Sequence, residues 1–313
     1  MKNNFMNAML VHIGTNLWYE EGNTKCCGEA VWQQPASSKM RFDLSFFREY
    51  TEKLAECGVN TLVLDLADGI VYESHPEIAI DGSLSRKVLE EEIARLRNMG
   101  FDLIPKLNLS ACHDYWLKDY AKMVSTETYY KVCRDLIHEA CEIFKPKYFH
   151  LGMDEENYEN QKLYDYVTVR QNDLWWKDLY FFIDCVEECG ARAVIWSDYA
   201  RNRPDEFVEK CPKSVLQCPW YYFNVFDAQN AEEYYKMRLL PFELFEKHGF
   251  DQFAGASNEY FPENFKLLKQ YCKEAVSEEH FFGMLQTTWK STVPENREKL
   301  FEAAELIKSA LQI

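Results

Sequence analysis

The sequence predicts a single (β/α)8 barrel, or TIM barrel, in which residues 1–313 form one α/β domain. Short apolar runs alternate with amphipathic runs eight times along the chain. This alternation is typical of a parallel sheet whose strands are joined by helices. A glycine, which readily takes the left-handed conformation that ends a helix, separates a helical run from the next apolar run at four junctions: Gly58, Gly100, Gly190 and Gly249.

The apolar runs are the expected strands, and they cover residues 9–13, 59–66, 101–107, 148–152, 192–196, 215–218, 250–256 and 282–287. Apolar residues at helical spacing predict the helices, over about 46–57, 89–96, 129–144, 175–186, 205–210, 232–248, 265–272 and 300–311. An open, doubly wound sheet is the alternative. The sequence favours it less, because no Gly-x-Gly-x-x-Gly turn follows the first strand.

Charge and cysteine content narrow the partners and the location. The net charge of −16 argues against a nucleic-acid partner, which needs clustered Lys and Arg. No apolar run approaches 18 residues, so no membrane span is expected, and no leader is visible at the N-terminus. The 11 cysteines include no Cys-x-x-Cys pair. We therefore expect reduced thiols, no zinc or disulfide framework, and a cytoplasmic location, with the oligomeric state left open.

Barrels of this class carry their active sites at the carboxyl ends of the strands. The segments that follow the expected strands are rich in polar and aromatic residues. They include Asp65, Asp68, Asn108, His113, His150, Asp154, Glu155, Trp196, Asp198, Trp220, Tyr221, Tyr222, Asn258, Glu259, Tyr260, Trp289 and Lys290.

Three tryptophans at strand ends indicate a sugar pocket. Trp196, Trp220 and Trp289 each follow a different strand, where a side chain faces the barrel mouth. An isolated tryptophan is more often part of a core. A pyranose, however, has apolar C–H faces and a polar rim, which suit flat aromatic walls surrounded by hydrogen-bonding groups. Taken together, the three predict a carbohydrate substrate.

The run His150-Leu-Gly-Met-Asp154-Glu155 carries the most information about chemistry. Strand alternation is expected to point His150, Gly152 and Asp154 to one side. Two adjacent carboxylates repel each other as anions, so partial burial is expected to raise the pKa of one of them. A carboxylic acid that keeps its proton near neutral pH can act as a general acid. A solvated acidic loop is the alternative.

This run resembles the His-x-Gly-Gly-Asp-Glu motif of glycoside hydrolase family 20, the β-N-acetylhexosaminidases. The resemblance implies that Glu155 protonates the leaving oxygen and that Asp154 binds the acetamido N–H of the substrate. The acetamido oxygen would then be the nucleophile, in a substrate-assisted retaining hydrolysis of a terminal N-acetylhexosamine. It further implies no cofactor and no metal, and a substrate-binding role for His113, His150, Trp196, Trp220, Trp289 and Tyr260, with Tyr221 and Tyr222 as second choices for the tyrosine.

The chain departs from the family pattern at several positions. Met153 replaces the second glycine of the motif, Thr15 and Asn16 stand where the family has an arginine, and Lys290-Ser291 replace a glutamate site. Two other functions stay open. One is a barrel that binds carbohydrate without catalysis. The other is a metal-dependent sugar isomerase or epimerase, with Asp65, His113, Glu155, Asp198 and Glu259 as ligands.

Overall fold

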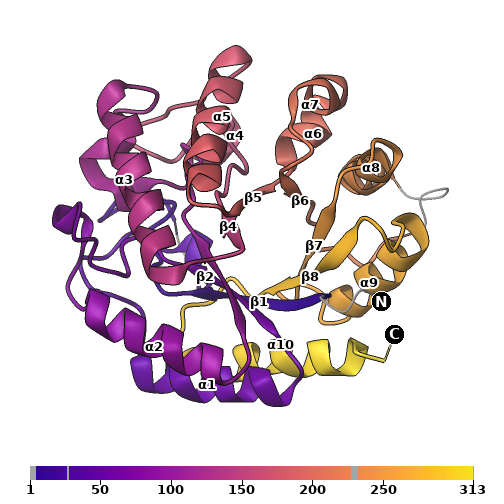
Figure 1. Ribbon diagram of the computed structural model, residues 1–313, viewed down its shortest axis with the longest axis horizontal. Helices are drawn as coiled ribbons and strands as arrows, with labels where there is room; N and C mark the ends of the chain where they lie inside the picture. The colour runs from indigo at the N-terminus through magenta and orange to yellow at the C-terminus, as the bar shows by residue number, and fades with distance from the viewer. Residues whose placement is uncertain (1–4, 27, 227–231, 313) are drawn as a thin grey trace.

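The computed structural model describes residues 5–26, 28–226 and 232–312, and its eight parallel strands close into a barrel in chain order (Figure 1). The first strand pairs with both the second and the eighth, so the open-sheet alternative is wrong. The strands are β1 (Met6–His12), β2 (Thr61–Asp65), β3 (Asp102–Lys106), β4 (Tyr148–His150), β5 (Arg192–Trp196), β6 (Leu216–Cys218), β7 (Gln252–Ser257) and β8 (Phe281–Thr287).

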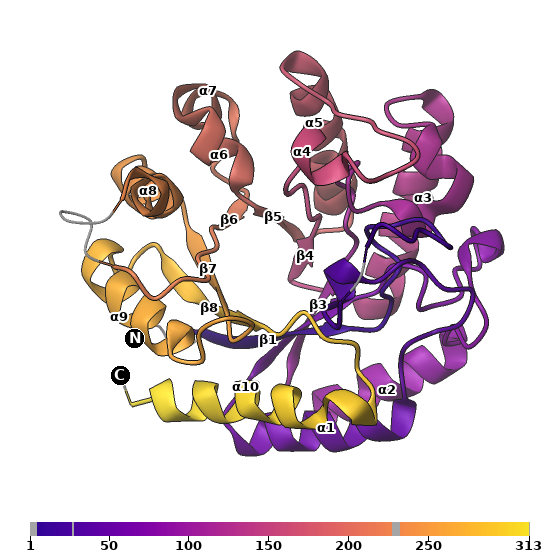
Figure 2. The same cartoon turned by 180° about the vertical axis from the view of Figure 1, so that it is seen from behind.

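Helices surround the barrel, and all eight of the expected helices are present (Figure 2). The α-helices are α1 (Leu44–Glu56), α2 (Arg86–Asn98), α3 (Glu127–Phe144), α4 (Tyr158–Gln161), α5 (Asp173–Glu188), α6 (Asp198–Asn202), α7 (Pro204–Lys210), α8 (Glu233–Lys247), α9 (Asn264–Ala275) and α10 (Arg297–Ala310). Among the described residues, four short 3-10 helices lie in loops: η1 (Val31–Gln33), η2 (Pro76–Ile78), η3 (Tyr115–Lys122) and η4 (Pro294–Asn296).

Local sequence explains where the principal helices begin and end. The side chains of Asp43, Ser85 and Thr126 accept hydrogen bonds from backbone N–H groups in the first turns of α1, α2 and α3. The four predicted glycines all have positive φ, between 68° and 94°. The helix-to-strand junctions predicted from the sequence are therefore confirmed.

Two apolar layers hold the fold together. One lies between the sheet and the helices, and includes Val11, Leu64, Phe149 and Ile195. The other fills the barrel interior, with Leu10, Val63, Ile104, Val194, Leu216, Phe253 and Leu285. Because successive residues of a strand point to opposite faces, the next inward positions lie nearer the carboxyl ends. In the first four strands these positions are polar: His12, Asp65, Lys106 and His150.

Helix α10 packs against α1, so the last helix closes the outer ring beside the first (Figure 2). Within the described residues, none of the helices has the length and apolar character that a membrane span requires.

Candidate active site

The segment after β4 is a tight turn rather than a continuation of the strand. The strand ends at His150, two residues earlier than expected, and Gly152, Met153 and Glu155 have φ of 74°, 73° and 56°. The expectation that strand alternation orients Asp154 is therefore wrong, since the turn orients it. Met153 and Glu155 adopt a conformation that side chains disfavour, which is the kind of strain found at functional sites.

Gly152 is required by packing as well as by its φ. A Cβ atom at this position would lie 2.0 Å from Oδ1 and 2.8 Å from Cα of Asn108. The missing side chain lets the turn press against the residue that follows β3. In this position the Asn108 amide donates a hydrogen bond of 3.0 Å to Asp154 Oδ1.

Asp154 is almost fully buried and surrounded by donors. His113 Nδ1 lies 3.1 Å from Oδ1, and Ser110 Oγ donates a 2.6 Å hydrogen bond to the backbone carbonyl. Burial raises the pKa of the Asp154 carboxyl, but the charge and hydrogen bond of His113, with the charge of Lys106, outweigh burial and lower it to about 2. Asp154 is therefore an anion at neutral pH.

His113 lies between the two adjacent carboxylates. Its Nε2 is 3.5 Å from Glu155 Oε2, while its Nδ1 faces Asp154. Burial lowers the pKa of the His113 imidazole, but the charges of Cys112 and Asp154 overcome burial and raise it well above its ordinary value. The Glu155 side chain is 36% exposed, so it faces the cavity while Asp154 is enclosed.

A third carboxylate, Asp198, lies at the start of α6 and supports the turn. It accepts hydrogen bonds from the backbone N–H of Glu155, at 3.2 Å, and from Trp220 Nε1. Burial raises its pKa to about 6; the charge of Arg201 opposes this rise, and those of Asp154 and Glu155 add to it. The sequence predicted a raised pKa within the Asp154–Glu155 pair, whereas the pKa of Asp154 is lowered and the carboxylate with the raised pKa is Asp198.

A buried arginine fixes the chain beyond the turn. Arg170 donates to both carboxylate oxygens of Glu156 (2.7 and 2.9 Å), to Asp178 (2.9 Å) and to the Leu109 carbonyl (2.7 Å). Glu156 is therefore in a buried ion pair, and not in the solvated acidic loop that was the alternative. This pair ties the segment after β4 to the segment after β3.

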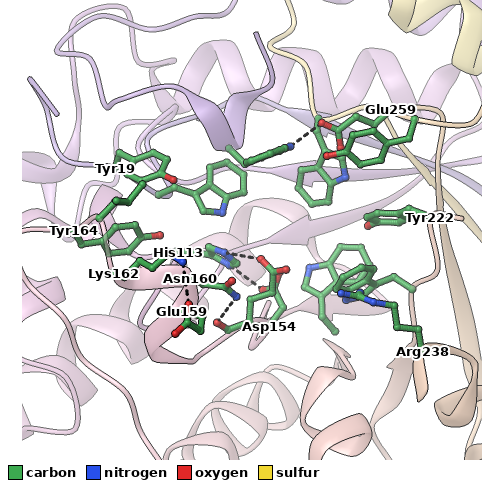
Figure 3. A pocket seen from close by; sticks show the side chains of 18 of the residues that line it. Tyr19, His113, Asp154, Glu159, Asn160, Lys162, Tyr164, Tyr222, Arg238 and Glu259 are labelled. Atoms are coloured by element: carbon green, nitrogen blue, oxygen red, sulfur yellow. Dashed lines mark hydrogen bonds and ion pairs between the residues drawn. The ribbon is translucent and has the colours of Figure 1, made fainter. Parts of the chain in front are cut away.

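These groups open into a cavity of about 370 Å³ at the carboxyl ends of the strands (Figure 3). Its walls are mainly aromatic. The rings are those of Trp18, Tyr19, Trp32, Tyr164, Trp196, Trp220, Tyr222, Phe223, Tyr260 and Trp289. The polar side chains include His113, Asp154, Glu155, Glu159, Asn160, Lys162, Arg238 and Glu259.

Seven of the eight residues chosen from the sequence line this cavity: His113, Asp154, Glu155, Trp196, Trp220, Tyr260 and Trp289. His150 does not, because it is fully buried against the Trp196 ring, 4.7 Å between centroids. Burial lowers its pKa to about 3, so His150 is a neutral support beneath the wall.

The three tyrosine candidates differ in position. Tyr260 is 56% exposed at the rim. Tyr221 is buried outside the cavity and donates to the Val225 carbonyl. Tyr222 lies in the cavity wall between Trp220 and Trp289, at centroid distances of 4.8 and 6.3 Å, and faces the cavity opposite His113 (Figure 3). Burial keeps its pKa well above the ordinary value, so its hydroxyl remains a donor.

Several wall residues come from loops that the sequence did not single out. Trp18 and Trp32 belong to the long β1–α1 connection, and Lys162 and Tyr164 to the β4–α5 connection. Loops have no hydrophobic periodicity, so the sequence pattern does not predict which of their side chains face the cavity. The available signal was that three tryptophans, Trp18, Trp32 and Trp289, lie in the connections after the first and last strands. Trp18 packs edge-on against Trp289, with ring centroids 6.0 Å apart.

The proposed isomerase ligands are not gathered around one point. Asp65 is fully buried and bonded to Lys106 Nζ at 2.6 Å, with His12 Nδ1 at 3.4 Å. Glu259 accepts from Trp32 Nε1 at 2.8 Å. Within the described ranges, the compact group that includes His113 and Glu155 is completed by Asp154, with ligand atoms within 4.8 Å of one another.

The positions that depart from the family motif are engaged within the protein. Asn16 donates to Asp68 Oδ2 and to the Ser37 carbonyl, both at 2.7 Å, and does not line the cavity. Lys290 Nζ lies 3.3 Å from Glu29. Neither residue therefore takes the place of the arginine or the glutamate that the family has at these positions.

Comparison with known proteins finds a shared fold without sequence similarity. No family model matches the chain, and no curated protein matches it. Among solved structures, a β-N-acetylhexosaminidase from Bacteroides fragilis NCTC 9343 superposes with a TM-score of 0.63 at 14% identity, over 97% of this chain and 65% of that one.

Two more solved structures give the same result. A GH20 exo β-N-acetylglucosaminidase from Vibrio harveyi, in complex with N-acetylglucosamine, has a TM-score of 0.62 at 14% identity, over 97% of this chain and 54% of that one. Dispersin B has a TM-score of 0.58 at 15% identity, over 85% of this chain and 94% of that one. This chain thus spans 54% to 65% of the first two, and it shares the barrel fold of all three.

Proposed function

We propose that this protein is a glycosidase that removes a terminal N-acetylhexosamine by substrate-assisted, retaining hydrolysis. The observation that carries the proposal is the Asp154–Glu155 pair. The first carboxylate is buried and anionic, and the second faces a cavity walled by tryptophans. The fold shared with a β-N-acetylhexosaminidase and an exo β-N-acetylglucosaminidase supports the proposal.

In this mechanism Glu155 donates a proton to the glycosidic oxygen as the bond to the anomeric carbon breaks. The substrate's acetamido oxygen attacks the anomeric carbon and forms a cyclic intermediate. Asp154 accepts a hydrogen bond from the acetamido N–H and stabilises the positive charge that develops there. Glu155, now a carboxylate, then takes a proton from the water that opens the ring.

Tyr222 is our choice for the tyrosine that holds the acetamido oxygen. It lies in the wall opposite His113, and its neutral hydroxyl can donate to an acceptor in the cavity. Tyr260, exposed at the rim, suits contact with a more distant part of the ligand. Trp196, Trp220 and Trp289 provide the apolar faces on which the sugar rests.

An enzyme-borne nucleophile is less well supported. A retaining pair needs a second free carboxylate about 5–5.5 Å from the acid. Asp198 is occupied by Trp220 and the Glu155 backbone, and Glu259 by Trp32. Both spare carboxylates are thus already hydrogen-bonded to the protein.

The direct test compares an aryl N-acetyl-β-glucosaminide with the aryl β-glucoside that has the same leaving group. The acetamido substrate should react at least about 10³-fold faster in kcat/KM, since only it carries the nucleophile. As a second test, Asp154→Ala should lose most of the activity on the acetamido substrate, because nothing then holds the acetamido N–H. Equal rates on the two substrates would refute substrate assistance while leaving Glu155 available as an acid.

We also propose a cytoplasmic location. In support, nine cysteines within the described ranges, from Cys57 to Cys272, form no disulfide, which suits a reducing compartment.

A further inference from the structure

The outer seam between α3 and α5 gathers metal-binding side chains that the proposed mechanism does not use. Helix α3 presents His138 and Cys141 toward α5, and α5 with its C-terminal cap presents Cys185, Glu188 and Cys189 toward α3. The two helices lie side by side on the outside of the barrel (Figures 1 and 2). Spacings of three and four residues place each set on one helical face.

Three of these side chains already surround one point. His138 Nε2 lies 3.1 Å from Glu188 Oε2, and the ligand atoms of His138, Cys185 and Glu188 all lie within 4.8 Å of one another. Ligand atoms in a tetrahedral zinc site are roughly 3.3–3.8 Å apart, given bonds of about 2.0–2.3 Å. The His138–Glu188 distance of 3.1 Å is slightly shorter than that spacing, and the Cys185 thiol, within 4.8 Å of both atoms, needs to approach by at most about an ångström.

Two further thiols flank this group. The Cys189 thiol donates a 3.3 Å hydrogen bond to the Cys185 carbonyl and shares a hydrogen bond with the Cys141 thiol. Cys185 is buried at the base of the seam, whereas the His138 and Glu188 side chains are 41% and 50% exposed at its rim. An ion can therefore enter from solvent and find a thiol beneath it.

Thiolate and imidazole ligands select zinc among the available divalent ions. We propose that His138, Cys185 and Glu188 bind Zn²⁺, with Cys189 or water as the fourth ligand, and that the ion clamps α3 to α5. On binding, the Cys185 thiol loses its proton to solvent and the ion takes the place of that proton. This site departs from the sequence expectation of no zinc, because its ligands come from two helices and form no local motif.

One positive charge competes for the seam. Arg134 Nε lies 3.9 Å from Glu188, and its guanidinium also contacts the Cys185 thiol. The same guanidinium stacks over the Phe181 ring at 5.0 Å and is 46% exposed. It can therefore remain on that ring when the ion displaces it from the two ligands.

The test is a titration of the reduced, metal-free full chain with Zn²⁺, followed by calorimetry, and with Cd²⁺, followed by the ultraviolet thiolate-to-metal charge-transfer band. The Cd²⁺ band reports a thiolate ligand, and its loss in Cys185→Ser assigns it to this site rather than to Cys112, which lies beside His113 and Asp154. His138→Ala and Cys185→Ser should each weaken Zn²⁺ binding about tenfold or more. His138→Ala keeps the test valid if the buried Cys185→Ser variant folds poorly.

His75→Ala is the matched control. Its imidazole also lies between two carboxylates, Glu77 at 3.0 Å and Asp135 at 3.2 Å, with no thiol in that contact. It should leave Zn²⁺ affinity within about twofold of the parent. Saturating Zn²⁺ should also raise Tm by about 3 °C or more in the parent and not in His138→Ala. A missing charge-transfer band, or equal Zn²⁺ affinity in His138→Ala and the parent, would overturn the proposal.

Discussion

Three carboxylates meet at the mouth of the barrel, and the pKa values of two of them, Asp154 and Asp198, are shifted in opposite directions. Asp154, between His113 and Asn108, has a pKa near 2. Burial raises the pKa of Asp198 to about 6, against the charge of Arg201 at 3.8 Å and the hydrogen bond from Trp220. Glu155 follows Asp154 in the chain but faces the cavity. Environment, and not residue type, therefore sets the different pKa values of Asp154 and Asp198.

Asp198 is the site group expected to titrate in the working pH range. Because its pKa is raised to about 6, it is protonated below that pH, and its hydrogen bonds from Trp220 and the Glu155 N–H weaken. Turnover should therefore fall as the pH drops through 6. Asp198→Asn cannot ionise and should lack this inflection in its kcat/KM profile. An unchanged inflection near pH 6 in the variant would assign it to another group.

Single residues also show the limit of the sequence argument. The motif located Asp154 and Glu155, but not the contacts that set the pKa of Asp154, because His113 lies 41 residues away in the chain. The sequence argument ranked Tyr260 before Tyr222, but it could not predict how exposed each side chain would be. Both follow a strand, and only the fold turns Tyr222 into the wall and leaves Tyr260 at the rim.

At the scale of elements, the turn after β4 brings Asp154 and Glu155 to the same cavity, which a longer strand could not do. Positive φ at Gly152, Met153 and Glu155 lets one short segment bury Asp154 and expose Glu155. Regular alternation would also have separated the two, but onto opposite faces of the sheet. The turn instead brings both to one cavity.

Gly152→Ala tests the packing of this turn. The new Cβ would clash with Asn108 in a conformation of φ 74°, so the free energy of unfolding should fall by about 2–4 kcal/mol in chemical denaturation. Gly190→Ala is the control. Its φ is 76°, but a Cβ there meets nothing within 4 Å, so only the backbone strain of about 1–2 kcal/mol remains. Equal losses in the two variants would show that contact with Asn108 is unimportant.

The strands and principal helices were predictable because periodicity and glycine stops are local signals. β5 matches its expected range, 192–196, while β1 begins three residues earlier than the expected 9–13. The short helices α4 and α6 were missed because they lie in active-site connections, where tertiary contacts such as those of Arg170 replace apolar periodicity.

At the scale of the whole molecule, the residues that stabilise the barrel and the residues that line the cavity lie in different parts of the fold. Helices and the two apolar layers form the scaffold, and loops at the carboxyl ends of the strands line the cavity. The proposed zinc clamp lies on the outer helices, whereas the proposed chemistry uses only protein side chains and the substrate's own amide. Activity and metal content should therefore be independent.

Exhaustive chelation tests this independence. Turnover of an aryl N-acetyl-β-glucosaminide at 25 °C should be unchanged after chelation, because Glu155 and the acetamido group supply the acid and the nucleophile. Tm should fall if zinc was bound at the α3–α5 seam. Loss of turnover that manganese, magnesium or zinc restores would instead favour a metal-dependent isomerase or epimerase.

The most direct test of the central claim is the dependence of Glu155→Gln turnover on the leaving group. A phenol of low pKa departs without protonation, whereas a sugar hydroxyl needs the proton that Glu155 supplies. The variant should lose about 10²–10⁴-fold in kcat on a disaccharide of N-acetylglucosamine, and far less on a dinitrophenyl N-acetyl-β-glucosaminide. Near-normal turnover of the disaccharide, or equal losses on both substrates, would contradict the assignment of Glu155 as the acid.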